Sequence, residues 1–199
     1  METNSKWTEN VIVADADYLD AVAFNLIVNF ERMLERRIPQ ADLARWAECA
    51  ALDGGLRGEG NQVMVVLLRE KGTKRMENFQ PSDLTTDVDG KAFQGALGEF
   101  TFSVVSTEEV ASKKQLTTDI LSLVCSQQEV KRLLVVPADT LLNDVHPLLN
   151  RLDSEERRTT LFTMQPARGG AFRQELLGYS LMAALGINAD EIDKKLNAV

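Results

Sequence analysis

The chain has 199 residues, of which 44% are hydrophobic and 26% charged, a composition typical of a globular protein rather than a disordered one. The length suits one domain. The formal net charge of −8 at pH 7 argues against broad, non-specific binding to nucleic acid. There is no apolar run long enough to span a bilayer and no signal-peptide pattern at the N-terminus, so we expect no membrane association and a cytoplasmic location.

The first third of the chain predicts one strand and two helices. Residues 9–14 form an apolar run rich in Val and Ile, typical of a buried strand. Apolar residues at helical spacing predict a long amphipathic helix over 19–34. A second helix is expected from Pro39, which suits a first helical turn, to Leu52, before Asp53-Gly54-Gly55.

The middle of the chain predicts two further strands. The run at 62–68 reads as a buried strand, and the polar segment 69–90 as a loop. We expect a short helix at 89–97, a strand at 99–105 and an amphipathic helix over 116–130.

The last third continues the alternation of strands and helices. The predicted elements are strands at 132–136 and 159–164, and helices at 145–152, 172–185 and 188–196. Such alternation predicts an α/β fold: a doubly wound, mostly parallel five-stranded sheet with helices on both faces and extra C-terminal helices.

Carboxylates follow two of the predicted strands. Asp15 and Asp17 come directly after the first strand, whereas Asp139 and Asp144 follow the strand at 132–136. The first strand and the strand at 132–136 are apolar on both faces, as central parallel strands are, so we expect them to be adjacent. Because side chains just past the carboxyl ends of central parallel strands face a common crevice, these acids can meet there. Oxygen-rich clusters of this kind hold Mg²⁺ or Mn²⁺. Each Asp has a simpler explanation as a helix cap, and that reading stays open.

With its elements in this order, the chain resembles the NYN domain, a branch of the PIN-like nuclease superfamily. Asp15 stands where the family has an Asp after its first strand, and Lys113-Lys114-Gln115-Leu116-Thr117-Thr118-Asp119 resembles the family's Lys followed by Asp. Pro137-Ala138-Asp139 and the segment from Asp144 resemble its acidic run after the fourth strand. The resemblance covers about residues 9–165. It implies one PIN-like domain over 1–199, with a C-terminal helical extension over about 168–199.

The resemblance further implies a metal-dependent ribonuclease. Mg²⁺ or Mn²⁺ would be held by carboxylates, would lower the pKa of a bound water and would neutralise charge on the phosphate of an RNA substrate. The implied metal ligands are Asp15, Asp17, Asp119 and Asp139, and the implied catalytic residues are Asp15, Asp119, Asp139 and Asp144.

Two alternatives remain open. The family's asparagine is replaced here by Tyr18, and residues are inserted before Asp144. One alternative is therefore a catalytically inactive module for interaction or oligomerisation, with a protein partner or a second copy of the chain. The other is a phosphatase like those of the haloacid dehalogenase superfamily, whose order of Asp-x-Asp, Ser or Thr, Lys and paired acids is imitated from Asp15-Ala16-Asp17 onwards. Lys113-Lys114 and Arg157-Arg158 are interpreted as solvated charges that would bind phosphate only if they border the cleft.

Overall fold

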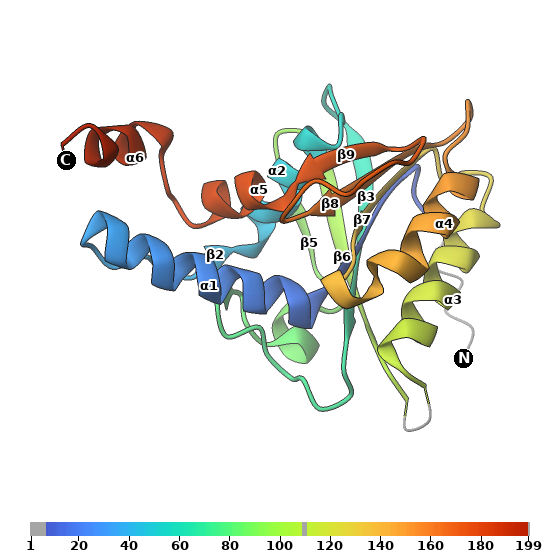
Figure 1. Ribbon diagram of the computed structural model, residues 1–199. Coiled ribbons are helices and arrows are strands. Elements are labelled where there is room, and N and C mark those ends of the chain that lie inside the picture. The colour runs from blue at the N-terminus through green and yellow to red at the C-terminus, as the bar shows by residue number, and fades with distance from the viewer. Residues whose placement is uncertain (1–6, 109–110, 199) are drawn as a thin grey trace.

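The computed structural model describes residues 7–108 and 111–198, and these build an α/β fold around one large sheet (Figure 1). The sheet has seven strands in the order β5-β6-β3-β1-β7-β8-β9. Every neighbouring pair is parallel except β5 and β6. The predicted α/β class and mostly parallel sheet are therefore confirmed, whereas the predicted number of five strands is wrong.

The strands of the large sheet are β1 (Asn10–Asp15), β3 (Asn61–Arg69), β5 (Ala92–Gln94), β6 (Gly98–Ser106), β7 (Arg132–Val136), β8 (Arg158–Thr163) and β9 (Arg173–Leu176). A separate pair joins β2 (Ala41–Asp42) to β4 (Phe79–Gln80). Counted along the chain, the six parallel strands lie side by side in the order 3-2-1-4-5-6. The strand order therefore reverses between β1 and β7, at the centre of the sheet.

Helices cover both faces of the sheet. The helices are α1 (Ala16–Leu34), α2 (Leu43–Asp53), α3 (Lys113–Cys125), α4 (Leu142–Leu152), α5 (Leu177–Ala184) and α6 (Ala189–Leu196), with single helical turns η1 (Leu84–Val88) and η2 (Asp139–Leu141). One core packs residues of α1, α2 and α5 against the sheet, among them Leu19, Trp46 and Leu181. A second core packs α3 and α4 against the opposite face, through Leu121 and Leu149.

The central strand β1 shows why the sequence pattern indicated a sheet of this kind. All six of its residues are buried, because Ile12 and Ala14 point into one core while Val11 and Val13 point into the other. A strand covered on both faces has no need for alternating polar residues, so it reads as a continuous apolar run.

Two predicted helices are wrong in whole or in part. The segment 89–97 contains strand β5, which pairs antiparallel with β6; stacking of Phe93 on Phe100, with ring centroids 4.9 Å apart, accompanies the pairing. The predicted helix at 172–185 begins instead with β9, paired with β8, and only then continues as α5. The C-terminal extension is thus not purely helical.

The boundaries of two other predicted segments also shift. The second helix begins at Leu43 rather than at Pro39, because the Asp42 side chain accepts a hydrogen bond from the backbone N–H of Arg45 and caps the helix there. The predicted loop at 69–90 includes β4 and η1. Within the described residues, no helix is both long and apolar enough to cross a membrane.

Candidate functional site

The predicted acidic site lies where the strand order of the sheet reverses. β1 pairs in parallel with β7 as well as with β3, which confirms the expectation that the first strand and the strand at 132–136 are central neighbours. In sheets of this kind, ligands bind in the crevice beyond the carboxyl ends of the strands at the reversal. Asp15 is the last residue of β1, and Asp139 opens η2 shortly after β7.

Asp15 is buried, with 4% of its surface exposed. Its Oδ1 accepts a hydrogen bond of 3.0 Å from the backbone N–H of Tyr18, so it caps α1. The same oxygen lies 3.2 Å from Nζ of Lys113. Burial raises the pKa of Asp15 above its ordinary value, and this effect outweighs the lowering by Tyr18 and Lys113.

Asp17 lies in the first turn of α1 and has three donors from other segments. Its carboxylate forms an ion pair with Lys113 and accepts hydrogen bonds from the Thr73 hydroxyl and from the backbone N–H of Glu70, the last at 2.8 Å. Burial alone would raise the pKa of Asp17, but these donors together hold it below its ordinary value. Asp17 thereby fixes the loop that follows β3 onto the start of α1.

Lys113 is the centre of this group of side chains. It is the first residue of α3, only 13% of its side chain is exposed, and Nζ also donates to the Leu68 carbonyl at 3.3 Å. The ammonium therefore pairs with two carboxylates and also satisfies a backbone carbonyl near the end of β3. We call Asp15, Asp17 and Lys113 the lysine-centred cluster.

Asp139 joins this region through Tyr18. The Tyr18 hydroxyl donates a hydrogen bond of 2.8 Å to Oδ1 of Asp139. Burial, with the nearby charge of Asp139, raises the pKa of Tyr18 well above its ordinary value, so the hydroxyl keeps its proton and stays a donor. The side chain at the place of the family's asparagine thus connects the two strand ends.

The other two predicted site residues have different surroundings. Asp144 forms an ion pair of 2.6 Å with Lys114, with 33% and 58% of the two side chains exposed. Asp119 is exposed on α3 and accepts a hydrogen bond from Gln115 of the same helix. Across 7–108 and 111–198, no three His, Cys, Asp or Glu side chains gather closely enough to hold a metal ion.

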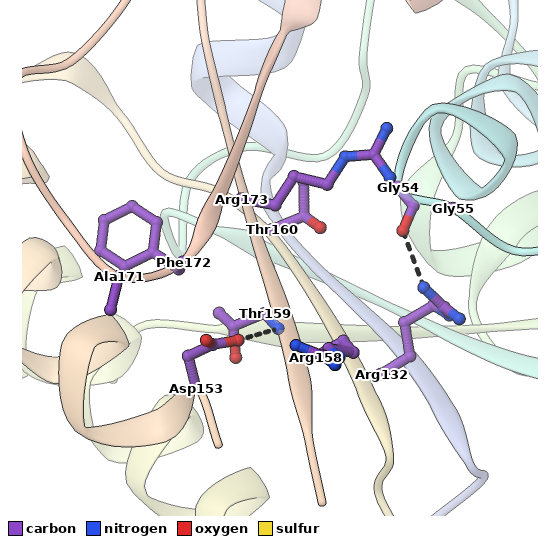
Figure 2. A pocket seen from close by; sticks show the side chains of 10 residues that line it. All are labelled: Gly54, Gly55, Arg132, Asp153, Arg158, Thr159, Thr160, Ala171, Phe172 and Arg173. Carbon is purple, nitrogen blue, oxygen red and sulfur yellow. Dashed lines mark hydrogen bonds between the residues drawn. The ribbon is translucent and has the colours of Figure 1, made fainter. Parts of the chain in front are cut away.

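A second candidate site is a pocket of about 420 Å³ at the amino ends of β7, β8 and β9 (Figure 2). It lies at the end of the sheet opposite to the carboxyl strand ends that carry the acidic cluster. Arg132, Arg158 and Arg173 are each the first residue of one of these strands. Arg132 pairs in register with Arg158, and Arg173 with Thr160. Since register partners in a parallel pair point to the same face of the sheet, the three arginine side chains leave β7, β8 and β9 on one face. We call this the arginine pocket.

The three guanidinium groups are not equally satisfied. Nη1 of Arg132 donates to the Gly54 carbonyl at 2.9 Å, but the buried Nε of Arg132 has no hydrogen-bond partner among the described residues. Arg173 forms an ion pair with Glu175 through Nε and Nη2, at 2.7 and 2.6 Å. The exposed Arg158 side chain has no hydrogen bond or ion pair with any described residue. Burial, followed by the nearby positive charges of Arg173, Arg57 and Arg158, lowers the pKa of Arg132.

Sequence reasoning missed the arginine pocket. It treated Arg158 as a solvated charge, although the available signal was an arginine at the start of two neighbouring apolar runs. Arg173 carried no such signal, because the strand it begins was predicted to be helical. Likewise the interpretation of Lys113 as a solvated charge is wrong, because only 13% of its side chain is exposed and its contacts with Asp15 and Asp17 appear only in the folded chain.

The fold and these two sites define an α/β protein with a mostly parallel sheet, a lysine-centred acidic cluster at the strand reversal and an arginine pocket at the amino ends of β7, β8 and β9. Residues 4–192 match a family of unknown function, DUF6621, and the chain belongs to that family. No curated protein and no solved structure matches the sequence.

Proposed function

We propose that this protein is a non-catalytic interaction module built on a doubly wound, PIN-like frame. The observation that carries the proposal is the position of Lys113, whose ammonium pairs with both Asp15 and Asp17. Tyr18 in turn occupies a lone pair of Asp139. The carboxylates at the strand reversal are thus engaged by donors of the protein itself, and they hold together segments from β1, β3, α3 and η2.

The carboxylates of the lysine-centred cluster can be tested as ligands for the predicted Mg²⁺ or Mn²⁺. Carboxylate oxygens are the right ligands for either ion. However, Asp15 accepts two donors and Asp17 three, and the Lys113 charge lies between them. In this arrangement the residues do not fit a divalent cation, because binding would require Lys113 to leave and its buried charge to find another partner.

A metal-assisted phosphate-ester hydrolase, either the ribonuclease or the phosphatase, is the second candidate. It is supported by the position of Asp15 and Asp17 at the end of β1 and of Asp139 after β7, where such sheets bind ligands, and by the Tyr18 hydrogen bond that links Asp139 to the start of α1. The phosphatase order also contains a Lys after its Asp-x-Asp pair, and here Lys113 contacts both Asp15 and Asp17. Against the phosphatase, the chain enters α1 directly at Ala16, with no flap after the acidic pair.

Thermal unfolding with and without metal separates the two candidates. A ligand that binds only the folded state raises the melting temperature by mass action. For the interaction module we expect 5 mM Mg²⁺ or Mn²⁺ to shift the wild-type melting temperature no more than it shifts Asp139→Asn, and no cleavage of single-stranded RNA or of p-nitrophenyl phosphate. Lys113→Ala, which removes the ammonium, should gain a Mn²⁺-dependent rise that the wild type lacks.

The opposite result would establish the hydrolase. A rise of several degrees in the wild type with Mn²⁺, lost in Asp139→Asn together with chelator-sensitive cleavage, contradicts the non-catalytic proposal. Asp119→Asn serves as the matched control, because it makes the same chemical change on an exposed carboxylate whose contact is with its own helix.

A further inference from the structure

We propose that the arginine pocket binds the phosphate group of a small phosphorylated molecule. This inference goes beyond the interaction role of the chain, because the pocket lies at the amino ends of the strands whereas the lysine-centred cluster lies at their carboxyl ends. It therefore stands whether or not the cluster performs chemistry.

The first argument is the arrangement of charge. Arg132 and Arg158 are register partners on adjacent parallel strands, and like charges directly opposite each other are unfavourable. The pocket-lining side chains carry three positive charges and, from Asp153, one negative charge. Their sum of +2 falls to +1 when Glu175, the ion-pair partner of Arg173, is counted, so the pocket still favours an anion in a protein whose overall net charge is −8. Planar guanidinium groups suit phosphate in particular, since their paired N–H groups match its oxygens.

Nearby acidic side chains pair with only some of the N–H groups of these arginines. Glu175 takes Nε and Nη2 of Arg173, but Nη1 of Arg173 and Nη1 of Arg132 both lie near Gly55, at 2.9 and 3.1 Å from where a Cβ on that glycine would stand. Asp153 accepts the backbone N–H of Thr159 at 2.8 Å (Figure 2). Asp53 also interacts electrostatically with Arg173, and Glu9 with Arg132. Arg158 is left with no counter-ion among the described residues.

The second argument is independent of charge. Thr159 lines the pocket and is only 1% exposed, yet its hydroxyl has no hydrogen-bond partner among the described residues. The buried Nε of Arg132, another lining residue, also lacks a hydrogen-bond partner in the part of the chain that the structure describes. Because buried polar groups in folded proteins are almost always paired, two orphaned donors at one pocket indicate a ligand with acceptor oxygens. Since successive strand residues point to opposite faces, Thr159 leaves β8 on the face opposite to Arg158, so a ligand that reaches both donors extends around the amino end of β8.

The size of the pocket selects the class of ligand. A volume of about 420 Å³ lies within the range of small-molecule sites, and it exceeds what a phosphate ion alone would fill. Ala171 and the buried Phe172 add apolar surface to the lining. The ligand is therefore a phosphate ester with a small organic group rather than inorganic phosphate.

Calorimetric titration of the full chain at 150 mM salt tests the assignment, with inorganic phosphate, pyrophosphate, AMP and a single-stranded RNA 12-mer as probes. We expect AMP to bind, and to bind at least tenfold more tightly than inorganic phosphate. Arg158→Gln should weaken AMP binding at least tenfold without lowering the melting temperature of the free protein, since its side chain has no partner in the described structure to lose. Arg37→Gln is the charge-matched control: its side chain is 95% exposed and lies outside the pocket lining, so AMP binding should be unchanged.

Thr159→Val separates ligand binding from stability. The substitution keeps the shape of the side chain and removes the orphaned hydroxyl, so the free protein should be as stable as the wild type or more stable, while AMP binding weakens severalfold. Absence of binding by AMP and pyrophosphate at 5 mM overturns the proposal. So does equal affinity for AMP and inorganic phosphate, AMP binding that survives both pocket variants, or binding of the RNA alone.

Discussion

Lys113→Met tests how much the lysine-centred cluster contributes to folding. Methionine has a side chain of similar length and no charge, so Asp15 and Asp17 would face each other without their shared cation. Removing one partner from a buried ion pair costs about 3–5 kcal/mol. Because 29% of the Asp17 side chain is exposed and Asp17 keeps two other donors, we expect the lower end, about 3 kcal/mol. For a chain of 199 residues this corresponds to a fall of about 6–12 °C in melting temperature.

The cost should also depend on pH. An acid whose pKa is raised by folding, such as Asp15, favours the folded state most below its unfolded pKa of about 4, and this contribution is lost as the pH rises through the folded pKa. Lys113 lowers the pKa of Asp15, so its removal raises that pKa further, which makes this loss larger and extends it to higher pH. Asp17, whose pKa is lowered, contributes stability above its unfolded pKa, and the variant loses the part that comes from Lys113. The deficit should therefore be larger at pH 7.5 than at pH 5.

Urea unfolding followed by circular dichroism at pH 5 and 7.5 measures both effects. Lys114→Met is the matched control: its pair with Asp144 is largely exposed, and exposed pairs contribute less than about 1 kcal/mol. The reasoning is refuted if Lys113→Met costs less than 1 kcal/mol at pH 7.5, or if its cost is the same at both pH values.

Two further substitutions test other parts of the structure by urea unfolding. Tyr18→Phe deletes the hydroxyl that donates to Asp139 and should cost about 1 kcal/mol; a double-mutant cycle with Asp139→Ala, which removes the acceptor, should recover most of that energy as coupling, and strictly additive effects would mean that the bond does not form in solution. Gly98→Ala should cost about 3 kcal/mol, because Gly98 has a φ of +140° and an added Cβ would stand 2.0 Å from the backbone oxygen of Asn61. A variant as stable as the wild type would show that the start of β6 is not held against β3 as described.

The buried strands could be predicted from the sequence because burial on both faces leaves a direct signature. β1, β3, β7 and β8 are each a run of mainly apolar or β-branched residues, and each was expected within one or two residues of its observed bounds. The alternation of these runs with amphipathic segments was enough to predict the α/β class, and the apolar character of both faces of β1 and β7 was enough to predict that the two strands are adjacent.

The short edge strands could not be predicted in this way. β5 has three residues and β9 four, with charged or polar residues at most positions of β9, so neither carries a period that a sequence window can detect. Their conformation is fixed by pairing with β6 and β8. The helical spacing of the apolar residues after Leu176 extended the predicted helix back over β9.

The sequence by itself determined which segments are buried strands and that carboxylates follow two of them. Only the tertiary structure decided what those carboxylates contact, because Lys113 reaches Asp15 and Asp17 from a different helix. The same holds for Arg132, Arg158 and Arg173, which become neighbours only through the strand pairings of β7, β8 and β9. The physical reason is that the burial of a strand is reflected in its own run of residue types. The electrostatic environment of a charged side chain, in contrast, depends on whichever distant side chain folding brings within a few ångströms.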